Sequence, residues 1–273
     1  MKILFAILLV CLAAVGVLSL LWRKNHPLWG QLERFRYAHR GYHDGSEAVE
    51  NSMTAFRRAA ERGWGVELDV HLMKDGNLAV IHDASLKRTA GADVTVEDLT
   101  REELAEYRLL HSGEAIPLLE EVLELFRDKG ALIVELKAEK GNHNALAEAV
   151  WQRLKDYEGL YCIESFDPRV LAWFRKNAPR VLRGQLATDF VKERNGLSLP
   201  LAFALTHLLL NVYTRPDFVA YEFKSREKLA LRLNKKCFGV REVNWTIRSR
   251  EDMLAAEAMG NLVIFEYFDP EKA

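Results

Sequence analysis

Short apolar segments alternate with amphipathic helical segments along most of this chain, and this alternation limits the fold more than any other feature. Continuous apolar runs without a polar face are typical of parallel strands, which are buried on both sides. The predicted strands span residues 35–39, 66–72, 78–81, 131–136, 160–165, 181–186, 218–221, 238–243 and 262–265. The pattern predicts an α/β protein whose parallel sheet is covered by helices.

The segments between these strands carry helix signals. Asn51 is the expected N-cap of the first helix, and Gly63 is expected to end it. The predicted helices span residues 53–62, 95–107, 118–129, 146–157, 168–177, 226–235 and 250–258. Eight main strand–helix units predict a closed (β/α)8 TIM barrel. The alternative is an open doubly wound sheet, which would favour a glycine-rich first turn.

Composition narrows the class of protein. The chain has 273 residues, enough for one large α/β domain or two small ones. Its formal net charge is −1, so there is no bulk electrostatic reason to expect nucleic acid binding. Cys11, Cys162 and Cys237 are too few and too scattered for a disulfide framework or a zinc site, and we expect free thiols.

Acidic residues lie near the carboxyl ends of the predicted strands. Glu67 and Asp69 are two residues apart in one strand and therefore face the same way, and Glu135 lies at the end of another strand. In a barrel this end is the mouth, where barrel enzymes keep their active sites. Carboxylates placed side by side repel unless a cation joins them, and oxygen ligands suit Ca²⁺ or Mg²⁺ and do not suit zinc. We predict that these three residues bind one divalent cation; the alternative is solvated charges with local salt bridges.

Two histidines accompany these carboxylates. His39 and His82 each follow a predicted strand, and imidazoles transfer protons near neutral pH. Arg40 adds a guanidinium that matches the geometry of a phosphate. A lone histidine is usually structural, but this combination suits metal-assisted attack on a phosphate ester. Three further histidines match no such pattern and are expected to be structural: His43, His71 and His111.

Five linked motifs carry a resemblance to a known family. They are His39-Arg40-Gly41, Glu50-Asn51-Ser52, Glu67-Leu68-Asp69-Val70, Asp75-Gly76 and His82-Asp83. In this order and spacing they resemble the signature of the glycerophosphodiester phosphodiesterase family. Weaker matches follow at Glu135-Leu136-Lys137 and Ser165-Phe166-Asp167-Pro168. The resemblance implies a (β/α)8 barrel and metal-dependent hydrolysis of glycerophosphodiesters to sn-glycerol 3-phosphate and an alcohol.

The resemblance also implies roles for single residues. His39 and His82 would be the catalytic acid and base, in an order that the sequence does not assign. The nucleophile would be water or a neighbouring hydroxyl of the substrate. Arg40 and Lys137 would stabilise charge on the phosphoryl group.

The roles of three further residues are less closely defined by the sequence. Glu50 is expected to orient a metal ligand or an active-site histidine. Trp245 is expected past a strand end, where it would either contact glycerol carbons or pack in the core. The family usually has a Thr-Asp pair after the last strand, whereas this chain has Phe265-Glu266-Tyr267. Glu266 is the candidate replacement for that acid, and the substrate pocket there is expected to differ.

The amino-terminal segment predicts a membrane anchor. Residues 3–22 contain no charged side chain, and about 20 apolar residues of helix cross a bilayer core. A cleaved signal peptide is the alternative, but no small-residue cleavage site precedes Trp22. Basic residues are more frequent after the run than before it, which favours a single-pass protein with a cytoplasmic catalytic domain over an exported one. The expected organisation is a transmembrane anchor at 1–24 and one catalytic domain at 25–273.

Residues 190–217 interrupt the alternation with an apolar insert. Its apolar part contains His207 and Asn211 as polar exceptions, and Pro200 argues against a second membrane span. The insert is interpreted either as a lid or bilayer-docking helix, or as an ordinary barrel helix with one buried face.

Two other functions are compatible with these features. The anchor and the insert would suit a lysophospholipase D-type phosphodiesterase that takes lysophospholipids from the bilayer. A catalytically silent barrel that binds a lipid headgroup is the non-enzymatic alternative, and the intact histidine pair argues against it. The expected partners are a small phosphodiester or lysophospholipid and the membrane, without nucleic acid.

Overall fold

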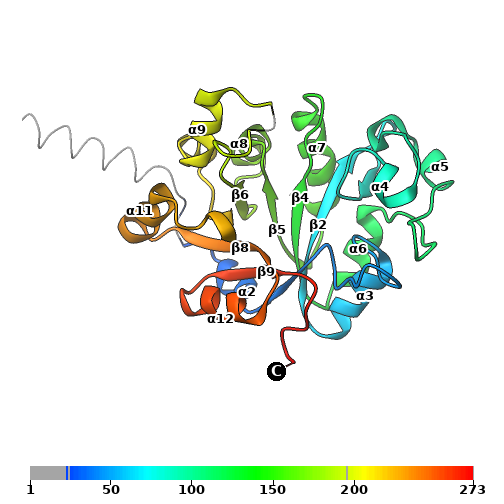
Figure 1. The fold of residues 1–273 in the computed structure, drawn as a ribbon. Helices are drawn as coiled ribbons and strands as arrows, with labels where there is room; N and C mark the ends of the chain where they lie inside the picture. The colour runs from blue at the N-terminus through cyan, green and yellow to red at the C-terminus, as the bar shows by residue number, and fades with distance from the viewer. Residues whose placement is uncertain (1–22, 24, 195, 273) are drawn as a thin grey trace, which may run out of the picture.

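The computed structural model describes residues 23, 25–194 and 196–272, and its centre is a closed barrel (Figure 1). The strands are β1 (Tyr37–His39), β2 (Gly65–Leu72), β3 (Leu78–Val80), β4 (Ala131–Leu136), β5 (Leu160–Ser165), β6 (Arg183–Ala187), β7 (Phe218–Glu222), β8 (Arg241–Ile247) and β9 (Leu262–Phe265). All except β3 are parallel, in the order β1-β9-β8-β7-β6-β5-β4-β2, and the pairing of β1 with β2 closes the ring. The predicted (β/α)8 barrel is confirmed, and the open-sheet alternative is wrong.

Burial on both faces explains why the strands are apolar until near their ends. In β4, Leu132 and Val134 pack outward in the cluster beneath the helices. Ile133, which points the other way, packs inside the barrel with Tyr37. Glu135 shares the inward direction of Ile133, two residues nearer the mouth.

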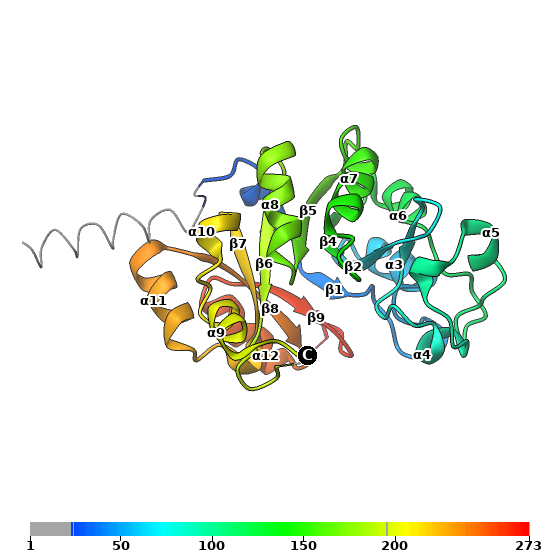
Figure 2. The same ribbon diagram turned by 90° about the horizontal axis from the view of Figure 1, so that it is seen from above.

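The helices form the outer layer, as the view from above shows (Figure 2). They include α3 (Met53–Glu61), α6 (Leu119–Phe126), α7 (His143–Leu154), α8 (Pro168–Asn177), α11 (Leu229–Phe238) and α12 (Arg250–Ala258). A short helix, α2 (Trp29–Leu32), precedes β1, and Trp29 packs on Phe218 with the ring centroids 5.6 Å apart. The hydroxyl of Tyr37 donates to the carbonyl of Leu32, which ties α2 to the barrel interior.

The start of α3 differs from the expectation. Ser52 is the N-cap, and its hydroxyl accepts a hydrogen bond from the backbone N–H of Ala55 at 3.1 Å. Asn51 is therefore not the cap. Its φ of 55° is a left-handed conformation that asparagine tolerates, and its side-chain amide donates to Asp69 Oδ2 at 2.9 Å.

Two predicted boundaries are wrong for reasons of helix capping. Residues 95–107 do not form one helix but η1 (Val96–Asp98) and α5 (Arg101–Leu104), because Thr100 forms a capping box with Glu103 and starts a new helix. Later, α11 continues to Phe238, and left-handed Gly239 ends it. The next strand therefore begins after residue 240 and not at 238.

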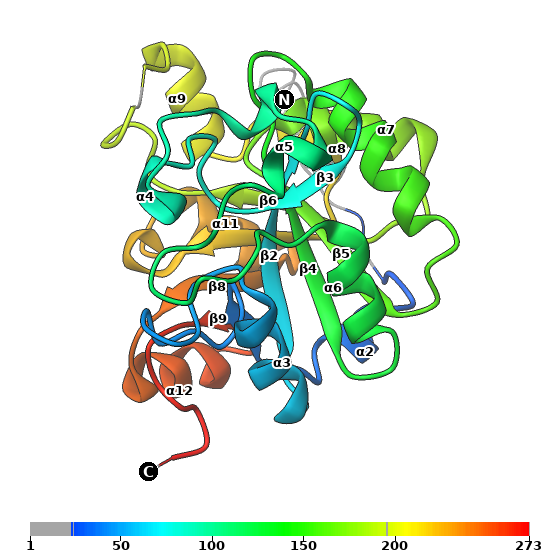
Figure 3. The ribbon, with the colours of Figure 1, turned by 90° about the vertical axis from the view of Figure 1, so that its right-hand side faces the viewer.

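The connection from β2 to β4, here called the β2–β4 excursion, has a core of its own. It contains β3, η1, α4 (Lys87–Ala90) and α5, and it buries Leu86, Leu104 and Ile116 against one another. Figures 1 and 2 place α4 and α5 on the opposite side of the barrel from α11. Seen from that side, the excursion lies in front of the barrel (Figure 3).

The apolar insert forms the connection from β6 to β7 and contains α9 (Leu199–Thr206) and α10 (Asn211–Thr214). Ala202 and Leu205 are buried beside β7, as in an ordinary barrel helix. The opposite side of α9 exposes Phe203, which an ordinary barrel helix would not do.

Among the described residues, no helix combines the length and the apolar character that a membrane crossing requires. The predicted anchor at 1–24 lies, except for Arg23, outside the described residues.

The barrel should depend on the apolar contact between α3 and the strands. We expect Phe56→Ala to lower the free energy of unfolding by about 3–5 kcal/mol, because Phe56 is fully buried in the outer cluster. Denaturant titration followed by circular dichroism measures this. The control is Arg57→Ala on the exposed side of the same helix, for which we expect a change within about 0.5 kcal/mol. Equal effects of the two substitutions would contradict the packing described.

Candidate active site

The carboxyl ends of three adjacent strands bring the predicted site residues together. His39 is the last residue of β1 and is paired in register with Glu67 of β2. Asp69 of β2 is in turn paired with Glu135 of β4. Because side chains in register on neighbouring strands face the same side, these four project together into the mouth of the barrel.

Glu67, Asp69 and Glu135 form a compact acidic cluster. Each offers a carboxylate oxygen within 4.8 Å of those of the other two, and all three residues are buried. The Lys137 ammonium lies 3.0 Å from Asp69 Oδ1 and 2.9 Å from Glu135 Oε1. The predicted convergence is confirmed; the carboxylates are buried and not solvated, but they do form the local salt bridges of the alternative interpretation. Their role as metal ligands stays a prediction.

Burial and mutual repulsion set the charge of this cluster. Burial raises the pKa of Glu67 well above its usual value, and the neighbouring Asp69 adds to the effect. Burial also opposes ionisation of Asp69, but Lys137 and Arg40 outweigh it and hold its pKa well below the usual range. Burial raises the pKa of Glu135 in spite of Lys137. The cluster therefore favours the uptake of positive charge.

The turn after β1 places Arg40 at the edge of the cluster. Its φ is 54°, and its backbone N–H donates to Glu67 Oε2 at 3.2 Å. Its guanidinium lies 3.4 Å from Asp69 Oδ2 and donates to Glu50 Oε1 at 3.0 Å. Gly41 follows with a φ of 82°, and an added Cβ there would meet α3. Glu50 thus positions Arg40, and it also accepts two hydrogen bonds from Arg88, the arginine that holds the carboxylate beside His82.

Glu266, which stands where the family usually has a Thr-Asp pair, orients His39. Its Nδ1 lies 2.6 Å from Glu266 Oε2, which leaves Nε2 facing the cluster, 3.8 Å from Glu67 Oε2. Arg248 donates to the other oxygen of Glu266 at 2.6 Å. Burial opposes ionisation of Glu266, but His39 and Arg248 lower its pKa to about 2, so it stays charged. Burial lowers the pKa of His39, which favours the neutral imidazole.

His82 reaches the same mouth from the β2–β4 excursion. Its Nδ1 lies 2.6 Å from Asp83 Oδ1, and Arg88 donates to the other oxygen of Asp83 at 2.6 Å. Burial lowers the pKa of His82. His71, which the sequence analysis left as structural, is bonded to the carbonyl of His82 at 3.1 Å and to Glu97. It therefore fixes the backbone that carries His82.

A cavity of about 40 Å³ lies between these groups and is partly apolar. His39, His82 and Lys137 line it together with Phe166 and Trp245. Trp245 was expected past the end of a strand, but it lies within β8. Its indole N–H donates to a backbone carbonyl of β7 at 2.9 Å, and its ring packs on Phe166 with centroids 5.6 Å apart. The packing role of Trp245 and its place at the cavity are therefore compatible.

Glu164 was missed by the sequence analysis. It lies in β5, is paired in register with Glu135 and lines the same cavity. Burial raises its pKa well above the usual value, and Glu135 adds to the effect. Its only signal in the sequence is an acidic residue inside an otherwise apolar strand.

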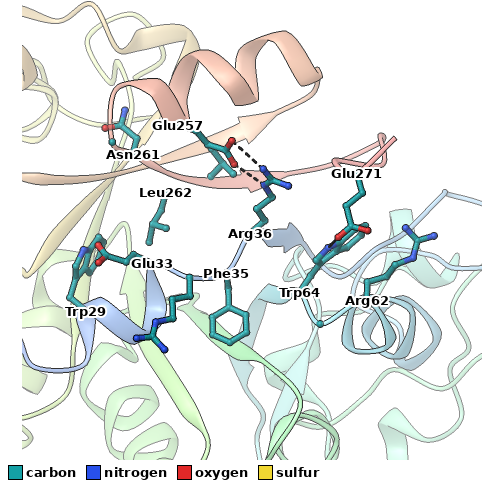
Figure 4. A pocket seen from close by; sticks show the side chains of 14 residues that line it. Trp29, Glu33, Phe35, Arg36, Arg62, Trp64, Glu257, Asn261, Leu262 and Glu271 are labelled. Atoms are coloured by element: carbon teal, nitrogen blue, oxygen red, sulfur yellow. Dashed lines mark hydrogen bonds and ion pairs between the residues drawn. The ribbon is translucent and has the colours of Figure 1, made fainter. Parts of the chain in front are cut away.

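A larger hollow of about 580 Å³ lies at the other end of the barrel (Figure 4). Arg36 directly precedes β1, and Leu262 begins β9, so this hollow is at the amino ends of the strands. Arg36 donates to Glu257 at 2.7 Å, and the indole of Trp64 donates to Glu271 at 3.0 Å. None of the predicted site residues lines it, and the active sites of barrel enzymes lie at the opposite, carboxyl-terminal end of the strands.

The donor set at the mouth fits a hard divalent cation. All three candidate ligands are carboxylates, and Glu67 Oε1 is buried without a hydrogen-bond partner among the described residues. A buried carboxylate oxygen without a partner is costly unless a proton or a cation satisfies it. Oxygen-only ligation suits Ca²⁺ or Mg²⁺.

Fold and site together define a class of protein: a (β/α)8-barrel hydrolase in which two imidazoles, each bonded to a carboxylate, lie beside a buried acidic cluster. Residues 39–266 match the model of the Glycerophosphoryl diester phosphodiesterase family. The chain belongs to this family. The matched region begins and ends at the hydrogen-bonded pair of His39 and Glu266.

Individual proteins support the same assignment. The chain is 34% identical over 227 residues to a glycerophosphodiester phosphodiesterase of Caldanaerobacter subterraneus, which covers 79% of this chain and 86% of that protein. It is 30% identical over 221 residues to a lysophospholipase D of Mus musculus, and the match covers 74% of this chain and 63% of that protein.

Two solved structures share the fold. A glycerophosphodiester phosphodiesterase from Thermotoga maritima has a TM-score of 0.65 at 28% identity, with 85% of this chain and 94% of that chain covered. An Oleispira antarctica phosphodiesterase, solved with its product sn-glycerol-3-phosphate, has a TM-score of 0.71 at 22% identity, with 89% and 95% covered.

The contact between Glu266 and His39 gives a test of the site. We expect Glu266→Gln to lower kcat by about 10²-fold, because the imidazole loses the charge that orients it. The measurement is steady-state hydrolysis of bis(p-nitrophenyl) phosphate. The control is Glu251→Gln on the exposed side of α12, which should leave kcat unchanged. Equal kcat values for the two variants would contradict the role given to Glu266.

Proposed function

We propose that this chain hydrolyses glycerophosphodiesters to sn-glycerol 3-phosphate and an alcohol, with one bound Ca²⁺ or Mg²⁺. The observation that carries the proposal is the meeting of His39, His82 and the acidic cluster at one small cavity. Family membership and the curated relative from Caldanaerobacter support the same reaction class.

The two imidazoles carry the proton transfers. One accepts a proton from the attacking oxygen, which is water or a neighbouring hydroxyl of the substrate. The attacking oxygen bonds to phosphorus as the phosphorus–oxygen bond to the alcohol breaks, and the other imidazole donates the proton that the departing oxygen needs. If the attacking oxygen is the substrate's own hydroxyl, water then opens the resulting cyclic phosphate to give sn-glycerol 3-phosphate. Lowered pKa values at His39 and His82 keep an imidazole free to accept a proton at neutral pH.

Cationic side chains stabilise the phosphoryl group. Arg40 and Lys137 border the cavity from β1 and β4, and both are held by the acidic cluster. For Lys137, burial opposes the charge, but Asp69 and Glu135 outweigh it and raise its pKa, so the ammonium persists. Glu67, Asp69 and Glu135 would hold the cation, which when bound neutralises charge on phosphate oxygens and orients the attacking oxygen.

A lysophospholipase D-type activity is the second candidate. It is favoured by the Mus musculus relative of that name and by the uncharged run at residues 3–22. We also propose that this run anchors the protein in a membrane with the catalytic domain on the cytoplasmic side, supported by the basic residues that follow it.

Removal of the cation or one ligand should abolish turnover. We expect EDTA to stop hydrolysis of glycerophosphocholine and added Ca²⁺ or Mg²⁺ to restore it. Glu67→Gln should lower kcat by about 10³-fold with the fold intact, because Glu67 offers an unpaired oxygen to the cation. Full activity in EDTA would contradict the cation requirement. Substrate binding without any turnover in the wild-type chain would favour the silent headgroup-binding barrel.

The two enzyme candidates differ in substrate. We expect kcat/KM for glycerophosphocholine to exceed that for lysophosphatidylcholine micelles, because Arg40 and Lys137 at the cavity offer charges that match a small polar diester. Coupled assays of released choline measure both on the same preparation. The reverse order would favour the lysophospholipase D-type activity.

A further inference from the structure

Exposed apolar side chains gather on one side of the barrel. The structure exposes Leu199 and Phe203 on α9, Leu209 and Tyr213 at α10, and Leu229 and Leu233 on α11, each by 48–67%. α9 and α11 pack in one cluster around β7, and Figures 1 and 2 place both on the same side of the molecule. We call this surface, residues 199–213 with α11, the α9–α11 face. Exposed apolar side chains gathered on one side of a molecule are typical of an interaction surface.

The outer stripe of α11 combines leucine with basic residues. Leu229, Arg232, Leu233 and Lys236 are spaced three and four residues apart and are all exposed, so they lie on one side of the helix. Leu231 is buried on the other side. Lysine and arginine beside exposed leucines can extend their charged ends to lipid headgroups while the leucines enter the membrane interface.

The charge around this stripe is mainly positive. Residues 223–239 contain six basic side chains, at 224, 226, 228, 232, 235 and 236, and one acidic side chain, Glu227. The balance of +5 contrasts with the net charge of −1 for the whole chain. Lys235 is paired with Glu242 at 2.6 Å and Lys228 with Asp189, and Arg226 and Arg232 each lie 3.9 Å from Glu227, whereas Lys224 and Lys236 are exposed. A basic, apolar surface fits anionic lipid headgroups.

The uncharged amino-terminal run joins the barrel at this face. Arg23 directly follows that run; its backbone N–H donates to the carbonyl of Pro216 at 3.0 Å, and its guanidinium lies 3.0 Å from Asp217. Both partners follow α10. Arg23 also lines one small hollow with Phe238, the last residue of α11. Arg23, the residue that follows the run, is therefore fixed beside the carboxyl ends of α10 and α11.

We infer that the α9–α11 face docks on an anionic lipid bilayer, with the leucines and Phe203 in the interface and the α11 lysines and arginines on the headgroups. The inference deepens the proposed membrane attachment and rests on it. An anchor that leaves from this face holds the face against the membrane that it enters. The β2–β4 excursion then points away from the lipid.

The test uses the full chain reconstituted in vesicles of phosphatidylcholine, with or without phosphatidylglycerol. An NBD fluorophore is attached to Phe203→Cys or Leu229→Cys in a background with Cys11→Ser and Cys237→Ser. The matched control is Leu110→Cys, exposed by 42% and hydrogen-bonded to α4 on the opposite side. Lipids brominated near the headgroup should quench the label at 203 and 229, leave it unchanged at 110, and quench more with phosphatidylglycerol.

Charge reversal and flotation separate the possible failures. Arg232→Glu with Lys236→Glu should remove the extra quenching that phosphatidylglycerol causes at 229. Quenching at 229 that ignores both the lipid charge and these substitutions would overturn the anionic preference. If the chain floats with vesicles but 203 and 229 are quenched no more than 110, the docking inference fails alone. Disulfide cross-linking of two chains through 203 without quenching would also overturn it, in favour of a second copy. If the chain does not float, the proposed anchor fails with it.

Discussion

Repulsion among the carboxylates that β2 and β4 place side by side is the interaction on which the rest of the site depends. Register leaves Glu67, Asp69 and Glu135 no room to separate, and burial denies them water. The cost is offset by fixed positive charge, from Arg40 in the turn after β1 and Lys137 at the end of β4. The divalent cation that we propose here would complete the charge balance that these two side chains begin.

A second principle governs the imidazoles. Each has a carboxylate on Nδ1, and each carboxylate is held in turn by an arginine: Glu266 by Arg248, and Asp83 by Arg88. Each carboxylate–arginine pair therefore prevents its imidazole ring from rotating. An imidazole held in this way loses little orientational freedom when substrate arrives.

Much of this arrangement was predictable, because strand periodicity and barrel topology determine which residues face the mouth. Glu135 could be assigned to the cluster from its position at a strand end alone. The exceptions have physical reasons. Asn51 is not the predicted N-cap, because its left-handed backbone conformation turns its side-chain amide toward Asp69. The break at Thr100 follows from a capping box inside a stretch that looks continuously helical. Contacts between distant segments, such as His71 with the His82 carbonyl, have no local signal in a sequence.

The β2–β4 excursion divides the proton-transfer machinery between two units of structure. His39 belongs to the barrel, whereas His82 belongs to a segment that packs on its own core. The pairing of β3 with barrel strand β2 and the bond from the Ile81 N–H to the Asp69 carbonyl place the start of this segment, and its own core positions the residues that follow His82. Insertions or substitutions beyond His82 can therefore reshape the space around that imidazole while every barrel strand keeps its partner. Such a division lets one barrel change one wall of its pocket without altering the acidic cluster.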